Sequence, residues 1–385
     1  MSERAPAAPA AALRTGAATG LILVAGSLQF SIFVAQVLLA AAIAAWIGLL
    51  AVEKRLPAAP RFGVPLALYA GMTLLSASLS LDPLTSLVDC KQLVLLLIVP
   101  MTYDLMSERL AWPAATVVMS AGAVSGVFGI AQYALLNYDT LDLRPRSTLG
   151  MYMTFSGLLM LVFGLAWSQL LFAKRGRSWP ALIVPALSVA LALTSTRSAW
   201  VGAFAALAML LVLRDSRLLA ILPLVAAIFL SAAPTGVVQR FYSIFDLTDP
   251  TNRDRVAMLR AGGQIVRAHP LTGVGPDMVE RVYPAYRVPE AVMETTPHLH
   301  SVPMQIAAER GLPALGLWAW FIAVAALDLW RLFRSGRERW LPAAGLATIV
   351  AMLGAGLFEY NFGDSEFQML FLFLLTLPFA AERTR

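Results

Sequence analysis

The chain has 385 residues, of which 59% are hydrophobic and only 14% are charged, and its mean hydropathy is +0.72. A soluble domain does not carry this much apolar surface, so lipid must be the solvent for most of it. The net charge of +6 is carried mainly by arginines, and the single cysteine, Cys90, excludes an internal disulfide and a cysteine-rich metal site.

Apolar segments long enough to cross a bilayer recur along the whole chain. We therefore predict an all-α polytopic membrane protein, with residues 1–385 forming one integral membrane domain of about twelve spans. The N-terminal region could imitate a signal peptide, but the hydrophobicity continues to about Val52 without a persuasive cleavage site, so we expect an uncleaved first hairpin. The expected spans are residues 16–29, 31–52, 63–80, 89–106, 112–137, 148–173, 179–195, 198–213, 217–235, 312–330, 340–358 and 366–381.

The basic residues predict the orientation of these spans. If the N-terminus is cytoplasmic, most arginines and lysines of the short loops fall on the cytoplasmic side, as the positive-inside rule requires. Both termini are then cytoplasmic, and residues 236–311 form a large periplasmic loop between the ninth and tenth spans. The inward basic residues are Arg4, Arg14, Lys54, Arg55, Arg61, Arg109, Lys174, Arg175, Arg177, Arg214, Arg217, Arg331, Arg334, Arg337, Arg339, Arg383 and Arg385; the outward ones are Lys91, Arg144, Arg146, Arg197 and Arg310.

The large loop has helical signals of its own. Asp249 or Thr251 can cap a helix that runs to a stop at Pro270, and turn residues then lead into a second short helix over 278–286. A compact helical cap over the membrane domain is the expected shape. We find no internal repeat in the sequence, which weakens a transporter interpretation because many transporters are built from repeats.

Arginines near the membrane edge are the first candidates for binding an anion. Arg197 stands in Thr194-Ser195-Thr196-Arg197-Ser198, between two apolar segments with almost no loop. A guanidinium there is costly without an anionic partner, although a simple interfacial anchor is the alternative.

A second set of arginines lies in the large loop. Arg253, Arg260 and Arg267 are seven residues apart, so on one helix they form a basic stripe that could hold phosphates, or could simply face solvent or lipid headgroups. Arg255 points to the other side of that helix, so only one of the two sets can face a ligand.

The histidines His298 and His300 end the large loop. Ser301 is a plausible N-cap, which places His300 at a helix N-terminus, where the dipole favours a neutral imidazole that can act as a general base. Ordinary capping or packing is the alternative. A metal is disfavoured because two histidines without a nearby third ligand are too few.

The break at Gly311 to Pro313 should separate an interfacial helix, 302–310, from the tenth span. The other outward polar residues, taken singly, are more typical of loop solvation: Asp89, Tyr138, Asp139, Asp142, Arg144, Arg146, Glu359, Tyr360, Asn361, Asp364 and Glu366.

Signatures of nucleotide-dependent and soluble enzymes are missing from the sequence: it has no P-loop, no GxSxG, no HExxH and no Rossmann glycine pattern. What converges at one membrane face is a candidate base and several arginines above apolar helices. This combination suits a lipid whose headgroup is a phosphate or diphosphate.

Three stretches together resemble the O-antigen ligase and polymerase family of bacterial envelope glycan enzymes. They are Thr194 to Gly202, Arg255 through His269-Pro270-Leu271-Thr272-Gly273-Val274-Gly275, and His300-Ser301 followed by nine residues and Gly311. The third stretch is similar to the ligase pattern, except that Pro313-Ala314 stands where a small or aromatic residue usually follows the glycine.

The resemblance implies a GT-C-like membrane glycosyltransferase of lipopolysaccharide biosynthesis. Such an enzyme transfers a glycan with inversion from undecaprenyl diphosphate to the lipid A core oligosaccharide, at the periplasmic face of the inner membrane, without metal, nucleotide or nucleic acid. By resemblance, His300 is the base, and Arg197 and Arg255 bind the diphosphate. Arg260 and Arg267 are the rivals of Arg255, and Arg144, Arg146 and His298 are secondary candidates for binding substrate.

Two other functions remain open at this stage. A polymerase of the same family would extend the glycan on its carrier lipid instead of moving it to the core. A lipid or anion transporter would need charged residues along a pathway, yet no charge falls near the middle of a confident span.

Overall fold

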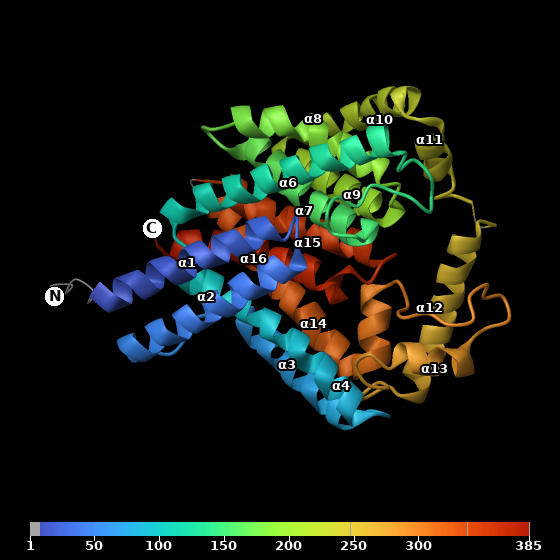
Figure 1. Cartoon of the computed structure of the whole chain (residues 1–385), viewed down its shortest axis with the longest axis horizontal. Helices are drawn as coiled ribbons and strands as arrows, with labels where there is room; N and C mark the ends of the chain where they lie inside the picture. The colour runs from blue at the N-terminus through green and yellow to red at the C-terminus, as the bar shows by residue number, and fades with distance from the viewer. Residues whose placement is uncertain (1–7, 247, 337, 385) are drawn as a thin grey trace.

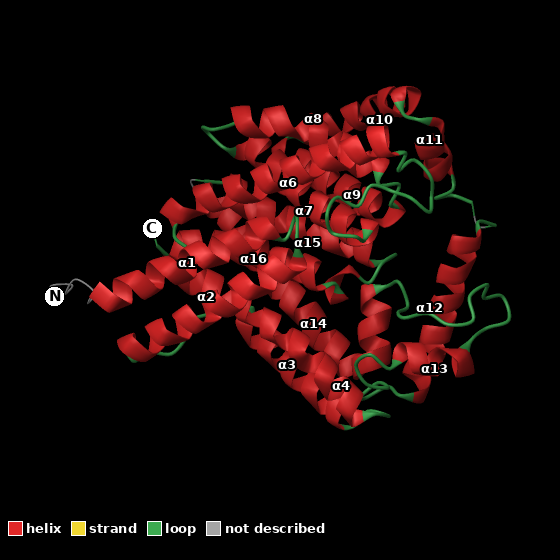
Figure 2. Cartoon of the chain, in the orientation of Figure 1, coloured by secondary structure: helices red, strands yellow, loops and turns green. Residues whose placement is uncertain are grey.

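The computed structural model describes residues 8–384 except 247 and 337, and within these ranges the chain is helical with connecting loops and no strand (Figure 2). The predicted all-α membrane architecture is confirmed. The helices are α1 (Ala8–Ser27), α2 (Ile32–Glu53), α3 (Gly63–Ser78), α4 (Pro83–Asp89), η1 (Cys90–Leu97), α5 (Ile98–Leu105), α6 (Glu108–Leu136), α7 (Tyr152–Phe172), α8 (Ser178–Leu193), α9 (Arg197–Arg214), η2 (Ser216–Ala220), α10 (Ile221–Ala232), α11 (Thr235–Tyr242), α12 (Pro250–Ala268), α13 (Val279–Tyr286), α14 (Val302–Ser335), α15 (Trp340–Gly356), η3 (Asn361–Gly363) and α16 (Ser365–Arg383).

Helix length and hydropathy identify the candidate membrane spans. Among the described residues, eight helices are long and apolar enough to cross a membrane, and four shorter apolar helices occupy the remaining expected spans. The chain is thus a multi-pass membrane protein, while about twelve spans stays a prediction. The helix expected from residue 16 already begins at Ala8, because alanines continue it and Glu53 neutralises Arg14.

The centre of the bundle is built from α7, α15 and α16, which pack against one another (Figure 1). α9 packs against α7 and α15. Most of α7 and α16 is buried inside the protein, whereas the hairpin of α1 and α2 leaves most of its apolar surface outside. A helix that is apolar on all sides is stable at the periphery only when lipid covers it.

One end of the bundle carries a charged cluster, which joins the start of α1 to the ends of α2, α5 and α16. The buried carboxylate of Asp104 accepts hydrogen bonds from Trp46 and Arg55, and Arg383 lies beside it. The described chain therefore begins and ends at the same end of the bundle (Figure 1). Arg4, Arg337 and Arg385, which the charge rule places in the cytoplasm, lie outside the described residues.

At the opposite end lie α12 and α13, with α11 to one side of them (Figure 1). The expected helix from Asp249 to Pro270 is confirmed as α12, with Asp249 as its N-cap, and the expected short helix is α13. Both pack on a small core of their own, separate from the core of the bundle. Its buried members are Met258, Ala261, Ile265, Val274, Met278, Val279, Tyr283, Leu299 and Ala308.

The turn between α12 and α13 connects these two helices to the bundle through hydrogen bonds. Val274 and Gly275 donate backbone hydrogen bonds to the carbonyls of Ala308 and Glu309, both at 2.9 Å. Ser76 of α3 donates its hydroxyl to the carbonyls of Thr272 and Glu309. The turn therefore holds the loop and the start of α14 in one arrangement.

The expected break at Gly311 is confirmed. Gly311 has φ of 82° and ψ of 167°, so it separates a first helical segment, 302–310, from the rest of α14. Its backbone approaches the carbonyl of Leu271 so closely that a side chain would collide with it. This close approach explains why a glycine stands here.

Candidate active site

Arg197 opens α9 directly after a sharp turn from α8. Ser195 has a positive φ of 52°, which brings the end of α8 and the start of α9 together without a loop. The side chain of Arg197 is buried, and its guanidinium donates to the carbonyl and hydroxyl of Ser243 and to Asp249. Its Nε atom is buried without a partner among the described residues.

Asp249 joins Arg197 to a second arginine. One carboxylate oxygen lies 3.3 Å from Arg197, and the other lies 3.9 Å from Arg240 of α11. Burial would raise the pKa of Asp249, but the hydrogen bond from the backbone of Asn252 and the charge of Arg197 hold it below its ordinary value. Asp249 is therefore a carboxylate shared between two guanidinium groups.

Glu359, in the loop between α15 and α16, gathers the other candidates. Its carboxylate lies 3.1 Å from Nε2 of His298 and 3.0 Å from Nδ1 of His300, and Arg255 of α12 lies 3.8 Å away. Burial would raise the pKa of Glu359, but the hydrogen bonds to His298 and His300 hold it well below its ordinary value. Glu359 is therefore ionised at neutral pH.

The contact with Glu359 orients the ring of His300. When Nδ1–H donates to the carboxylate, Nε2 carries the lone pair, and Nε2 has no hydrogen-bond partner among the described residues. His300 also has a positive φ of 49°, an uncommon conformation that its neighbours must stabilise. A carboxylate that orients a histidine with one free nitrogen is the arrangement that general-base catalysis needs.

Four arginines act on one another through their charges in this region: Arg144, Arg197, Arg240 and Arg255. Burial lowers the pKa of Arg255, Glu359 opposes that effect, and the nearby charge of Arg197 adds to it. The carboxylates of Asp249 and Glu359, together with the charge of Asp142 on Arg144, neutralise this positive charge only in part. The site therefore keeps an excess of positive charge that would attract an anion.

Residues 181–319 match the family model described as O-antigen ligase. Over these residues the chain is similar to the O-antigen ligase family. The match includes Arg197, Asp249, Arg255 and both site histidines, whereas Glu359 lies beyond it. A comparison with curated proteins found no match.

The structure corrects the prediction about metal binding at this site. The sequence predicts no third ligand near the two histidines, but Glu359 lies beside them, and the three ligand atoms lie within 4.8 Å of one another. The prediction is wrong on this point because the third ligand is distant in the sequence. A bound cation would nevertheless face Arg255 at 3.8 Å from the carboxylate, and that repulsion disfavours a metal here.

The other predicted site residues fall into two groups. Arg260 and Arg267 are exposed on the outer face of α12, and Arg260 pairs with the exposed Glu290. The structure does not bring them to His300, whereas it does bring Arg255.

Arg144 and Arg146 both lie in the loop between α6 and α7. Arg144 covers the ring of Tyr152 at 4.1 Å and acts electrostatically on Arg197 and Arg240. Arg146 lies over Tyr138 and donates to its hydroxyl.

Sequence reasoning missed Glu359, Asp249 and Arg240 as site residues. The sequence predicts only loop solvation for Glu359 and only a helix cap for Asp249. The available signal for Glu359 was its position, because a carboxylate directly after an apolar span needs a cationic partner. For Arg240, the sequence offers no indication of a site residue except its place in an amphipathic segment.

Proposed function

We propose that the protein transfers an O-antigen glycan from undecaprenyl diphosphate to the lipid A core oligosaccharide, at the periplasmic face of the inner membrane. The observation that carries this proposal is the meeting of His300 and Arg255 on Glu359, beside Arg197. A candidate base and an excess of positive charge that can bind a phosphate group thus lie together at one end of an apolar bundle. In this orientation, residues 236–311 form the periplasmic cap and both termini are cytoplasmic.

The proposed reaction is a single displacement. Nε2 of His300 accepts the proton of an acceptor hydroxyl while that oxygen attacks the anomeric carbon of the donor. The bond from this carbon to the diphosphate breaks on the opposite face, so the configuration inverts, and the leaving electron pair stays on the diphosphate. Arg197 and Arg255 stabilise the departing charge, and Glu359 stabilises the imidazolium.

The ligase is favoured over the polymerase by the pattern from His300-Ser301 to Gly311. Both enzymes need the same donor site, so the arginines and the base do not separate them. They differ in the acceptor alone, which is why the experiment must identify the product. Growth of glycan on the carrier lipid would indicate the polymerase.

The test uses purified protein with polyprenyl diphosphate glycan and rough lipopolysaccharide, in EDTA and without nucleotide. The wild type should produce a ladder of glycan on the lipid A core, and His300→Ala should lower the rate by about 100-fold to 10,000-fold. Full activity of His300→Ala would reject the base assignment. Loss of wild-type activity in EDTA, restored by a divalent cation, would reject the metal-independent mechanism.

Arg197→Lys is the companion variant, because it keeps the charge but cannot form two parallel hydrogen bonds to a phosphate. We expect it to lose most of the transfer activity while the protein remains folded. Wild-type activity in this variant would show that Arg197 is only an anchor between α9 and the loop at Ser243.

A further inference from the structure

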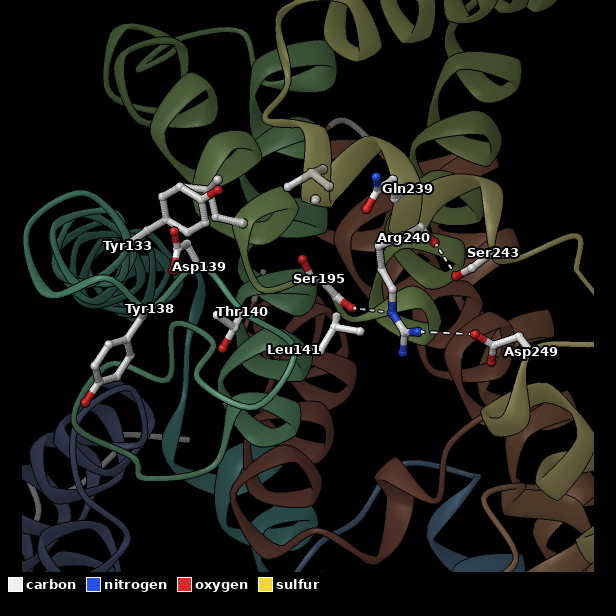
Figure 3. Close-up of a pocket in the computed structure, with 13 residues that line it drawn as sticks. Tyr133, Tyr138, Asp139, Thr140, Leu141, Ser195, Gln239, Arg240, Ser243 and Asp249 are labelled. Atoms are coloured by element: carbon white, nitrogen blue, oxygen red, sulfur yellow. Dashed lines mark hydrogen bonds and ion pairs between the residues drawn. The ribbon is translucent and has the colours of Figure 1, made fainter. Parts of the chain in front are cut away.

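A pocket of about 360 Å³ lies beside Arg240 (Figure 3). Its volume is within the range of about 300–1,000 Å³ that small-molecule sites occupy. It is formed by the last part of α6 and the loop after it, by the end of α8 and the turn to α9, and by α11 and the segment from α11 to the N-cap of α12. The lining residues are Tyr133, Tyr138, Asp139, Thr140, Leu141, Leu193, Ser195, Gly236, Val237, Gln239, Arg240, Ser243 and Asp249.

One wall of the pocket is basic. The side chain of Arg240 is only 10% exposed, and its two protein contacts are long: 3.4 Å from Nε to the carbonyl of Ser195 and 3.9 Å to Asp249. Asp249 lies closer to Arg197 than to Arg240, so it does not neutralise Arg240 fully. Burial and the charges of Arg197 and Arg144 lower the pKa of Arg240 to about 10. An anion bound here would relieve this accumulation of positive charge.

The opposite wall offers groups that bind hydroxyls. Asp139 and Thr140 come from the loop after α6, near the ring of Tyr133, whereas Gln239 lies beside Arg240, one residue before it on α11 (Figure 3). Carboxylate, hydroxyl and amide groups can all accept or donate hydrogen bonds to sugar hydroxyls, and tyrosine rings provide flat apolar surface. The two walls therefore match a molecule with a phosphate at one end and hydroxyl groups at the other.

We propose that this pocket binds a phosphorylated sugar, with its phosphate on Arg240, beside Gln239, and its hydroxyls at Asp139 and Thr140. This inference rests on the proposed function and adds Arg240 to the residues that bind substrate. A phosphate next to a sugar occurs in the diphosphate-linked donor and in a phosphorylated core acceptor. The chemistry is the same for both sources, and kinetics can distinguish them.

The test measures KM for the donor and for the acceptor with Arg240→Gln. Loss of a hydrogen bond to a charged group should raise one KM by about 10-fold to 100-fold, with a much smaller change in kcat. A raised donor KM assigns the phosphate to the carrier-linked glycan. A raised acceptor KM, seen with phosphorylated but not dephosphorylated rough lipopolysaccharide, assigns it to the core. If neither KM changes, the proposal is overturned.

Two further variants show whether a change in KM reflects loss of binding or misfolding of the protein. Gln239→Leu, on the same helix, leaves the ion pair of Arg240 and Asp249 intact and should raise the same KM by a smaller factor. Arg331→Gln, an exposed arginine near the far end of α14, should leave both KM values unchanged.

The failure of the pocket proposal is distinguishable from the failure of the proposed function. If the wild type transfers no glycan under any condition, the proposed function fails. Binding of inorganic diphosphate to the wild type and to Arg240→Gln then tests the pocket alone. Weaker binding by the variant supports the pocket, and equal binding overturns it.

Discussion

Glu359 links the two functional halves of the site, because the histidines and Arg255 all contact its carboxylate. It comes from the loop before α16, whereas the groups that it orients come from α12 and from the end of the preceding long loop. A buried carboxylate in this position determines both the tautomer of His300 and the direction of Arg255. Its removal should therefore affect catalysis without removing any group that touches the substrate.

We predict that Glu359→Gln lowers kcat by at least about 100-fold, because the amide can leave the proton on the wrong nitrogen of His300. Donor KM should change far less, which separates loss of the oriented base from loss of binding. Glu294→Gln, an exposed carboxylate of the same cap, is the matched control. Equal kcat values for the wild type and Glu359→Gln would show that the carboxylate does not orient the base.

The same residue makes stability depend on pH. The pKa of Glu359 is depressed in the folded protein, so its stabilising contribution is complete above its ordinary value of 4.5 and is lost as the pH falls through the folded pKa. At pH 7, Glu359→Gln should lower the free energy of unfolding by about 3 kcal/mol, because Arg255 stays buried without its partner. Thermal unfolding from pH 7 downward should show this difference narrowing below pH 4.5; a constant difference would contradict it.

The turn from His269 to Gly275 matters as an element, because it sets where α12 and the start of α14 lie relative to each other. Its backbone hydrogen bonds to Ala308 and Glu309 hold the segment that follows His300. The bounds of α12 were predictable from its cap and its proline stop. Residue spacing alone did not decide which face of α12 carries the candidate arginine, because Arg255 and the exposed stripe are equally basic; the ranking of Arg255 came from the resemblance.

Gly273→Ala tests whether this turn, and not only the helices that it connects, holds the loop against the start of α14. Gly273 has φ of +65°, and an added Cβ would lie 2.3 Å from the carbonyl group of Glu309. Strain and collision together should cost about 3 kcal/mol. We expect a lower unfolding temperature and faster proteolysis of the cap.

Gly263→Ala is the control for this substitution. Gly263 lies on α12 with open space around its Cα. Alanine there should stabilise the helix by roughly 0.5–1 kcal/mol. Equal effects of the two substitutions would show that the close approach at Gly273 is unimportant.

At the scale of the whole molecule, the two ends of the bundle differ in how far their charges are paired. One end is closed by the paired charges around Asp104, and the other carries the unbalanced arginines of the candidate site. The positive-inside rule places the first end in the cytoplasm. The proposed reaction needs the second end in the periplasm, where the lipid-linked glycan would meet its acceptor.

Cysteine labelling tests this orientation. In a Cys90→Ser background, Glu294→Cys in the cap and Arg175→Cys between α7 and α8 both lie at exposed positions. A membrane-impermeant maleimide added to intact spheroplasts should label Glu294→Cys, and should label Arg175→Cys only after lysis. The reverse pattern would contradict the predicted topology and the periplasmic reaction.

The sequence by itself determined the membrane class, the positions of the apolar helices, α12, α13 and the break at Gly311. These features depend on local composition, periodicity and capping, which act between neighbours in the chain. The histidines and Arg197 were also predictable, because polar groups at a membrane edge need a reason to be there. The resemblance already ranked Arg255 above the stripe, but only the tertiary structure placed Arg255 against Glu359 and brought Arg240 to the site. These placements depend on contacts between segments far apart in sequence, and residue spacing carries no information about such contacts.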